Sequence, residues 1–381
     1  MKKKILLGLS GSIACSKAEL FVKQYADEYE FKLLSTYNGL NYLTDEFIKS
    51  NKIYSDWNEL SGSPHIELSR WADEIIVYPA SANLISKISS GIADDLLTST
   101  ILMFSKPLYI CPAMHEEMYI NSQIQSNILK ISKSHYVVGP RYGNLDIGDR
   151  GLGRLIEPHE LYTVINRLKG KVIVTSGPTY EEIDDVKVIT NRSSGKQGKA
   201  LAVELNARGY EVVYIHASSI DDIPGLINVP FNNSQDLKNK ILENIINSQS
   251  IFMAAAVSDF TLNKTSGKIS RGKDNINLEF KPNEDIIASI KTLHPEVTCI
   301  AFSAQVDDQL NFKKINSKKV DYLVINNVLS NKFGSDFNKV TIIDKHQLIY
   351  ESETLDKNDI SRDILNTLEY WNVCRCRDNC E

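Results

Sequence analysis

The sequence lacks several features that would point to particular classes of protein. It has no excess of basic residues, since 43 lysines and arginines stand against 48 aspartates and glutamates. The net charge of −5 and the lack of a polybasic block predict no nucleic-acid partner. The longest apolar runs, such as EIIVYPA and IFMAAAV, fall far short of the about 20 residues that span a bilayer, so we expect no membrane partner.

Glycine-rich dinucleotide motifs are also missing. No Gly-x-Gly-x-x-Gly follows the first strand that we predict in either half of the chain, which argues against a plain nicotinamide dehydrogenase. The start MKKKILLGLSGSIA is basic and then apolar, like a signal peptide. However, glycines break the apolar run and the amphipathic SKAELFVKQYADEY follows directly. We therefore predict a buried first strand here.

Cysteine is sparse, with six residues in the chain. Three lie in or beside apolar segments, where a thiol packs like a small hydrophobe: Cys15, Cys111 and Cys299. Three lie in the terminal WNVCRCRDNCE: Cys374, Cys376 and Cys380. Their spacing is not a standard zinc spacing and no histidine accompanies them, so a frayed terminus is favoured over a metal or redox site. A reduced, cytoplasmic protein fits this usage best.

What is present is one pattern that occurs twice. Short apolar runs alternate with amphipathic segments, and the apolar runs of the first half are KKILLGLS, FKLLST, EIIVYPA, PLYICPA and HYVVGP. Those of the second half are KVIVTSG, EVVYIHA, SIFMAAAV, TCIAFSA, YLVINNV and KVTIIDK. Such alternation predicts parallel sheets covered by helices on both faces. We predict an α/β protein with two doubly wound, Rossmann-like domains at 1–168 and 169–371, and a tail at 372–381.

Polar loops follow the predicted strands of the first half. In GLSGSIA, Gly11 lets the backbone turn and Ser12 can cap a helix expected from about Ser12 to Glu28, which would create an anion site. A tight structural turn is the alternative. Ser35 follows the second strand, and Ser81, Asn83 and Thr98 follow the third. Ligands of doubly wound sheets bind at this edge, so these loops suit a phosphorylated cofactor.

The stretch GNLDIGDRGLGRLIEP, residues 143 to 158, fits neither a helical period nor the alternation of a strand. It carries four glycines in its first eleven positions. It lies where one α/β pattern stops and the next begins. From the residues alone it is either a linker or a mobile part of an active site.

Several motifs resemble known families. PASAN (79–83), GIADDLLT (91–98), PAMHEEMY (112–119) and SPHIELSRWAD (63–73) resemble the flavin-binding cysteine decarboxylases. SGPTYEEIDDVKVITNRSSGKQGKALA (176–202), AAAVSDF (254–260), KIS (268–270), NEDI (283–286) and VDYLVINNV (320–328) resemble the phosphopantothenate–cysteine ligases. Together they resemble the bifunctional phosphopantothenoylcysteine decarboxylase/phosphopantothenate–cysteine ligase family of coenzyme A synthesis. The resemblance implies an N-terminal flavodoxin-like flavoprotein domain and a C-terminal ligase domain.

For the second half, the resemblance implies ligation of cysteine to a phosphorylated acid through an acyl-cytidylate, with CTP as co-substrate and Mg²⁺. Asn191 matches the residue that handles the acyl-cytidylate, and Lys268 the lysine that supports carboxylate activation. The implied CTP-contacting set is Ser194, Gly195, Asp259, Asn283, Glu284, Asp285, Ile286, Phe302, Lys314 and Lys318. The chain departs from the family pattern at Ser270, Gln305 and Asn327, and the metal ligands stay unknown.

For the first half, the resemblance implies FMN-dependent decarboxylation of a C-terminal cysteine, with FMN held by Gly11, Ser12, Ser35, Ser81, Asn83 and Thr98. His65 matches the catalytic base, and an imidazole suits that task near neutral pH. The stretch 143–158 then resembles a flap over the substrate, with Gly148, Gly151 and Gly153 as hinge-like glycines.

Two positions break the family pattern. His115 stands where the family has an asparagine that holds the substrate carboxylate, and Ile147 where it has the cysteine that donates a proton. Three interpretations stay open: the reaction stops at an oxidised enethiol, the substrate is another acid, as in a specialised pathway, or the first half is a scaffold that only binds flavin. A non-catalytic regulatory flavoprotein is the remaining alternative. By resemblance we also expect trimers or dodecamers through the flavin domain and dimers through the ligase domain.

Overall fold

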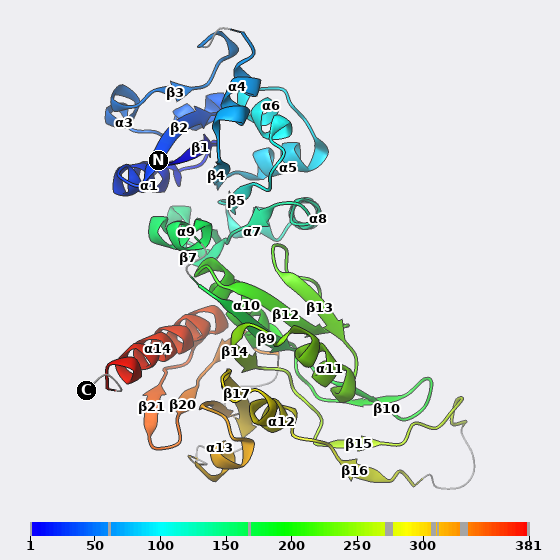
Figure 1. The fold of residues 1–381 in the computed structure, drawn as a ribbon. Helices are drawn as coiled ribbons and strands as arrows, with labels where there is room; N and C mark the ends of the chain where they lie inside the picture. Colours follow the sequence, from blue (N-terminus) through cyan, green and yellow to red (C-terminus); the bar gives the residue numbers. More distant parts are fainter. Residues whose placement is uncertain are drawn as a thin grey trace. The chain divides into compact units, whose positions relative to one another are not determined.

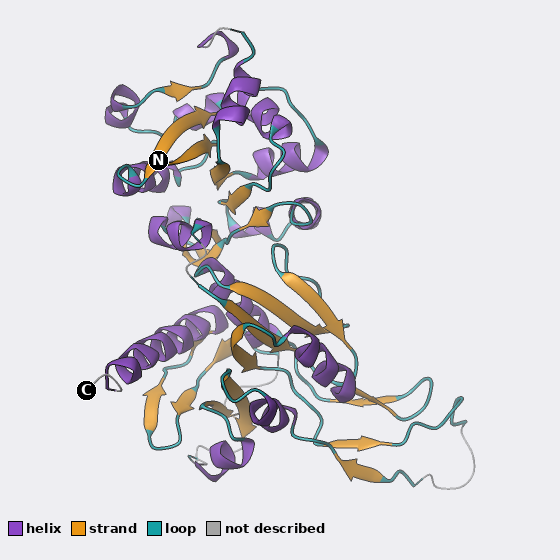
Figure 2. Ribbon diagram, in the orientation of Figure 1, coloured by secondary structure: helices purple, strands orange, loops and turns teal. Residues whose placement is uncertain are grey.

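The computed structural model describes residues 2–59, 62–166, 169–270, 277–305, 310, 312–327 and 334–378. The chain divides into two compact units. The first comprises residues 1–169 with 206–209 and 224–226, and the second comprises 170–205, 210–223 and 227–381. Helices and strands alternate along both units, as Figures 1 and 2 show, so the predicted α/β class is confirmed.

The first unit is built around a six-stranded sheet in the order β3-β2-β1-β4-β5-β6. Every neighbouring pair of its strands is parallel. Its strands are β1 (Lys3–Leu9), β2 (Tyr29–Ser35), β3 (Ile53–Tyr54), β4 (Glu74–Ala80), β5 (Tyr109–Pro112) and β6 (Tyr136–Val137). Its helices are α1 (Cys15–Tyr25), α2 (Tyr37–Leu40), α3 (Asp45–Ser50), η1 (Trp57–Glu59), α4 (Pro64–Trp71), α5 (Ala82–Ser90), α6 (Leu96–Met103), α7 (Glu116–Tyr119), α8 (Ser122–Ile131) and α9 (Pro158–Ile165).

Both faces of this sheet are buried, which explains why its strands are continuous apolar runs. Ile5 and Leu7 of β1 pack in one buried cluster, whereas Leu6 packs in the cluster on the opposite face. The order of the strands reverses at β1, whose two neighbours are β2 and β4. A crevice for ligands is expected at such a switch point, beyond the carboxyl ends of the strands.

Helix α1 differs from the prediction. It begins at Cys15 and ends at Tyr25, inside the expected range of Ser12 to Glu28. Its N-cap residue is Ala14, which makes no side-chain capping bond. The Ser12 hydroxyl instead accepts a hydrogen bond from the Ala14 N–H (3.3 Å), so the loop makes a further turn before the helix begins.

A β-hairpin follows this sheet. Strands β7 (Arg141–Asn144) and β8 (Arg150–Arg154) pair antiparallel, and the short turn η2 (Asp146–Gly148) lies at the tip. The stretch without a recognisable period therefore forms paired strands. The glycines hid the pattern because they supply no side chains to alternate.

The second unit contains an eight-stranded sheet in the order β13-β12-β9-β14-β17-β18-β20-β21. These strands are β9 (Lys171–Ser176), β12 (Glu211–Ala217), β13 (Ile227–Phe231), β14 (Ser248–Met253), β17 (Thr298–Gln305), β18 (Tyr322–Asn327), β20 (Thr341–Ile343) and β21 (Leu348–Glu351). The pairs up to β18 are parallel, but β20 pairs antiparallel with both β18 and β21. The expectation of purely parallel sheets is therefore wrong at this edge of the second sheet.

Helices α10 (Lys196–Ala207), α11 (Ser234–Asn244), α12 (Ile286–Leu293), α13 (Phe312–Lys318) and α14 (Lys357–Asp378) accompany the second sheet. Smaller strand pairs complete the unit: β10 (Tyr180–Glu182) with β11 (Val188–Thr190), β15 (Phe260–Leu262) with β16 (Phe280–Pro282), and β19 (Phe337–Asn338) with β22 (Leu355–Asp356). In Figure 1, β10, β15 and β16 lie side by side, away from the large sheet.

The C-terminal segment also differs from the prediction. Helix α14 continues to Asp378, so the backbone at Cys374 and Cys376 is helical rather than frayed. Cys380 lies outside the described residues. Among the described residues, no helix is long and apolar enough to cross a membrane.

Candidate functional sites

The switch point of the first sheet is held together by Ser10, which directly follows β1. Its hydroxyl donates to the Pro79 carbonyl oxygen (2.8 Å) and accepts from the Ser81 N–H (2.8 Å). Ser10 is 1% exposed, so these bonds are shielded from water. They fix the loop after β1 against the loop after β4, which are the two predicted cofactor loops GLSGSIA and PASAN.

A cavity of about 560 Å³ opens beside this junction. It brings together three residues that the sequence singled out separately: Ser12 in the loop after β1, His115 after β5, and Ile147 at the tip of the hairpin. Its remaining wall consists of Ile13, Ala14, Lys17, Tyr42, Ala113, Met114, Asn144, Leu145, Asp146, Gly153, Arg154 and Leu155. The predicted flap and the predicted phosphate loop thus border one cavity.

His115 connects the two sides of this site. Its Nδ1 faces a carboxylate oxygen of Glu117, and its Nε2 lies 3.0 Å from Asp149 Oδ2 in the hairpin. Glu117 first, and Asp149 in addition, raise the pKa of His115 above its usual value. The imidazole therefore holds a proton more readily than a free histidine, and as a cation it can bridge both carboxylates.

The predicted hinge glycines of the hairpin lie in different surroundings. Ile147 adopts a left-handed backbone conformation (φ 56°) and is 85% exposed. Gly148 also has positive φ, and a Cβ there would meet nothing within 4 Å. At Gly153 a Cβ would lie 2.1 Å from the Met114 carbonyl oxygen, and at Gly151 it would lie 2.7 Å from a Glu116 carboxylate oxygen. Gly151 and Gly153 therefore allow close approach of β8 to residues 114–116, and their role as hinges stays a prediction.

The other predicted FMN residues lie outside the lining of this cavity. The Ser35 hydroxyl donates to the Thr36 carbonyl oxygen (2.9 Å), and the Thr98 hydroxyl contacts Asp95 in a capping box that starts α6. Ser81 caps α5, and Asn83 on that helix is exposed. At Gly11, a Cβ would lie 3.1 Å from Asn38 Cβ, so the loop packs closely there. These residues shape the edge of the sheet on which the cavity lies.

His65 lies near the start of α4, also outside the cavity lining. Its ring packs edge-on against Trp57 with the ring centroids 5.4 Å apart. Its Nδ1 is buried and finds no hydrogen-bond partner in the described part of the chain. A buried, unpaired ring nitrogen is unusual, because such groups are normally satisfied.

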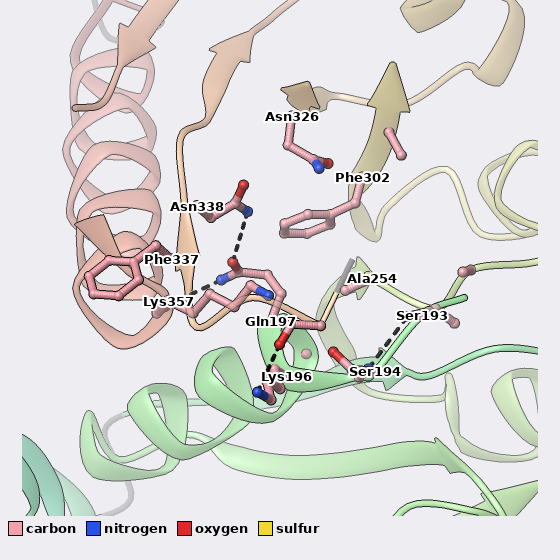
Figure 3. Close-up of a pocket in the computed structure, with 16 residues that line it drawn as sticks. Ser193, Ser194, Lys196, Gln197, Ala254, Phe302, Asn326, Phe337, Asn338 and Lys357 are labelled. Atoms are coloured by element: carbon pink, nitrogen blue, oxygen red, sulfur yellow. Dashed lines mark hydrogen bonds between the residues drawn. The ribbon is translucent and has the colours of Figure 1, made fainter. Parts of the chain in front are cut away.

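A second pocket, of about 140 Å³, lies at the carboxyl edge of the large sheet, as Figure 3 shows. The SSGKQG segment, residues 193 to 198, forms one wall and leads into α10. Beneath it the Ser176 hydroxyl donates to the Gly195 carbonyl oxygen (2.8 Å). Gly195 has φ 72°, and a Cβ at Gly198 would lie 2.6 Å from Ser176 Oγ. Glycine at these positions lets the loop lie on the sheet and present N–H groups at the start of a helix.

The predicted ligase residues are grouped unevenly. Ser194, Gly195 and Phe302 line the pocket, whereas Asn191 donates to the carbonyl oxygen of the lining residue Ala256 (3.0 Å). Most of the others are tied into bonds outside the lining: Glu284 to Lys238 (2.7 Å), Asp285 to Lys318 (2.7 Å), Lys314 to Ser303 (2.8 Å), and Asn283 to the backbone of Ser258 and Asp259 (3.0 and 2.8 Å). Ile286 is buried as the first residue of α12, and Lys268 is exposed.

Comparisons with known proteins agree with this division. Residues 168–370 match the DNA/pantothenate metabolism flavoprotein C-terminal domain family, and residues 1–170 match the Flavoprotein family. The chain is 34% identical to the coenzyme A biosynthesis bifunctional protein CoaBC of Bacillus subtilis, over 96% of either chain. The chain belongs to the family of coenzyme A biosynthesis bifunctional proteins.

Two further proteins, one curated and one of solved structure, are similar to this chain. A cysteine/cysteine sulfinic acid decarboxylase from an unknown prokaryotic organism is 33% identical, over 82% of this chain and 91% of that protein. The solved C-terminal domain of a coenzyme A biosynthesis bifunctional protein CoaBC is 27% identical. It covers 53% of this chain and 98% of its own, with a TM-score of 0.45.

One wall of the pocket at the large sheet consists of residues that the sequence motifs did not single out. Gln197, Asn338 and Lys357 line it, and Asn338 donates from Nδ2 to Gln197 Oε1 (3.2 Å). Burial lowers the pKa of Lys357, and the nearby Lys196 lowers it further. No local motif marks Asn338 or Lys357, because they reach the site from β19 and the start of α14, far along the chain. Gln197 lies inside the SSGKQG motif.

No cluster of three or more histidine, cysteine, aspartate or glutamate residues in the described ranges could hold a metal ion. The resemblance to the ligases implies Mg²⁺ together with CTP, so the ligands of that ion have to come from elsewhere. Mg²⁺ is commonly bound through substrate phosphates and water, with few protein ligands.

Proposed function

We propose that this chain joins cysteine to phosphopantothenate with CTP and decarboxylates the cysteinyl product with FMN. The observation that supports this best is the pairing of two sites in one chain of this family. One is a cavity between a phosphate-type loop and a hairpin, and the other is a pocket under a glycine-containing loop at a helix start. Each lies at the ligand edge of a doubly wound sheet.

In the ligase half, the backbone of residues 193–198 would hold phosphate groups of CTP at the start of α10. Mg²⁺ would be bound mainly by those phosphates. Lys268 would stabilise the charge that accumulates as the carboxylate attacks, and Asn191 would orient the acyl-cytidylate. An amide suits that task because it does not compete with cysteine as a nucleophile.

In the first half, the residues present fit FMN. The cavity of about 560 Å³ lies within the roughly 300–1,000 Å³ of small-molecule sites. Its wall contains the loop after β1 and the cation Lys17, whose Nζ donates to Glu157 (3.0 Å). FMN when bound would act as the electron acceptor that makes loss of CO₂ easy. His65 would move a proton, either in its own subunit or across a subunit boundary.

A second candidate function for the first half is decarboxylation of a different cysteinyl acid, or a reaction that ends at the oxidised enethiol. Two observations favour it. Ile147 borders the cavity and cannot donate a proton, and His115 brings a cation-forming group into it. In addition, one protein similar to this chain is named for a different substrate, as a cysteine/cysteine sulfinic acid decarboxylase.

We further propose a cytoplasmic homo-oligomer, with trimers or dodecamers through the flavin unit and dimers through the ligase unit. Such an assembly gives the buried, unpaired nitrogen of His65 a function outside the cavity of its own subunit.

The test uses purified full-length protein with phosphopantothenate, cysteine, CTP and Mg²⁺. Mass spectrometry should detect the amide, and the absorbance spectrum should show bound flavin. Complete conversion to phosphopantetheine would exclude the second candidate. An amide that is converted only to an enethiol, or not at all, would favour it. A colourless protein that binds no added FMN and releases no pyrophosphate from CTP would refute the proposal.

A further inference from the structure

Asp184 lies in the tight turn between β10 and β11, and its side chain is fully buried. Its Oδ1 accepts hydrogen bonds from the N–H groups of Val186 and Lys187, both at 2.7 Å. This oxygen therefore closes the turn. Two bonds to a single carboxylate oxygen would already suffice for an ordinary turn-forming aspartate.

The other oxygen of Asp184 reaches a distant part of the chain. Oδ2 accepts from the Ile269 N–H (2.9 Å) and from Lys187 Nζ (2.7 Å). Lys187 Nζ also donates to the Ile269 carbonyl oxygen (2.9 Å). Both polar backbone groups of Ile269 are thus held by one ion pair, formed by the buried Asp184 and the half-exposed Lys187.

The residue on the other side of Lys268 is held as well. Asp185 Oδ2 accepts from the Gly267 N–H (2.8 Å), and the Asp185 N–H donates to the Gly267 carbonyl oxygen (3.2 Å). Lys268 therefore lies between two anchored residues. Its own side chain is exposed, and the described residues offer it no hydrogen bond or ion pair.

The same hairpin leads to the pocket. Strand β11 ends at Thr190, and the next residue, Asn191, bonds to Ala256 in the pocket lining. We infer that Asp184 is a positioning residue, which holds Lys268 at a fixed place relative to Asn191 for the ligase reaction. The inference rests on the proposed function, because that function gives Lys268 and Asn191 their roles.

The charge of Asp184 matters as much as its shape. The bond from Lys187, with the three backbone N–H groups, holds the pKa of Asp184 far below its usual value despite burial. The group is therefore ionised and all four of its bonds are accepted bonds. Asparagine could keep the Oδ1 bonds that close the turn, but its amide NH₂ cannot accept from Ile269 or Lys187.

The experiment compares Asp184→Asn with Glu182→Gln in the full-length protein. Glu182 is half-exposed and its described ion pair is with Lys264 alone, so it serves as the control. We expect Asp184→Asn to lower kcat for CTP-dependent pyrophosphate release about tenfold to a hundredfold, as small misplacements of reacting groups do. The KM for CTP should stay unchanged, because residues 193–198 are not altered. Hydrogen exchange at the Ile269 amide should become faster in Asp184→Asn and not in Glu182→Gln.

A second pair of variants separates positioning from folding. Lys187→Met should reproduce the loss of kcat, whereas Lys187→Arg should restore most of it because arginine keeps the donors. Unchanged exchange at Ile269 in Asp184→Asn would refute the anchor. Faster exchange with wild-type kcat would refute its role in the reaction. A wild-type protein without CTP-dependent activity would refute the proposed function, while the exchange comparison would still decide the anchor.

Discussion

At the scale of single residues, the same residue type plays different roles within one short stretch. Gly148 lies at the hairpin tip with positive φ and open space around it, whereas Gly153 lies where β8 passes the Met114 carbonyl oxygen. The sequence shows glycine at both places. Only the approach of another backbone segment distinguishes the two roles, and a local pattern cannot report that approach.

Replacing Gly153 by alanine should therefore destabilise the first unit. The added Cβ would meet a backbone oxygen at 2.1 Å, and backbone cannot rotate away as a side chain can. We expect a loss of about 1–3 kcal/mol, typical of overpacking, and a lower midpoint in thermal unfolding. Gly148→Asn is the matched control, since asparagine tolerates left-handed conformations. Equal midpoints for Gly153→Ala and the wild type would show that β8 does not pack against residue 114.

At the scale of elements, the hairpin is held to the loop after β5 by the contact of His115 with Asp149. The pKa of His115 is raised by Glu117 and Asp149, so the folded value exceeds the value of about 6.5 in an unfolded chain. The stabilisation that the protonated imidazole gives the folded hairpin is therefore fully present at pH values below the unfolded pKa. It is lost as the pH rises through the raised pKa of the folded state.

We therefore expect the hairpin tip to loosen at alkaline pH. Amide hydrogen exchange at residues 145–150 should be slower in the wild type than in His115→Asn under mildly acidic conditions, and the difference should vanish at alkaline pH. Comparing two proteins at each pH cancels the intrinsic dependence of exchange on pH. His159→Asn, on the exposed side of α9, should match the wild type throughout. A difference between wild type and His115→Asn that is independent of pH would contradict an ionic contact.

Most of the sheet elements were predictable, because strands buried on both faces must be apolar runs. The elements that escaped prediction depend on distant partners. The antiparallel edge at β20 cannot be distinguished from a parallel one by its residues, and the hairpin lacks alternating side chains. Among the residues that line the two cavities, Ser12, Ser194 and Gly195 could be singled out from the sequence because they lie in local loop motifs. Asn338 and Asp184 could not, because their roles arise only when segments over eighty residues away in the sequence pack beside them.

At the scale of the whole molecule, two units with separate cores carry separate sites. We expect variants to affect one activity at a time. Asn191→Ala should lower amide formation about a hundredfold through loss of orientation, and leave the flavin spectrum and decarboxylation of added cysteinyl substrate unchanged. Asn239→Ala, on the exposed face of α11, should change neither. Loss of flavin in Asn191→Ala would show that the units depend on each other.

The hairpin of β10 and β11 also limits how this chain can change length. Asn191 continues one of its strands, and the turn at Asp184 meets the neighbours of Lys268. One residue inserted between Glu182 and Val188 would shift the register by about 3.3 Å and rotate alternate side chains to the other face. Insertions and deletions in this segment would therefore be tolerated best in pairs of residues, because a shift by two returns each side chain to its original face.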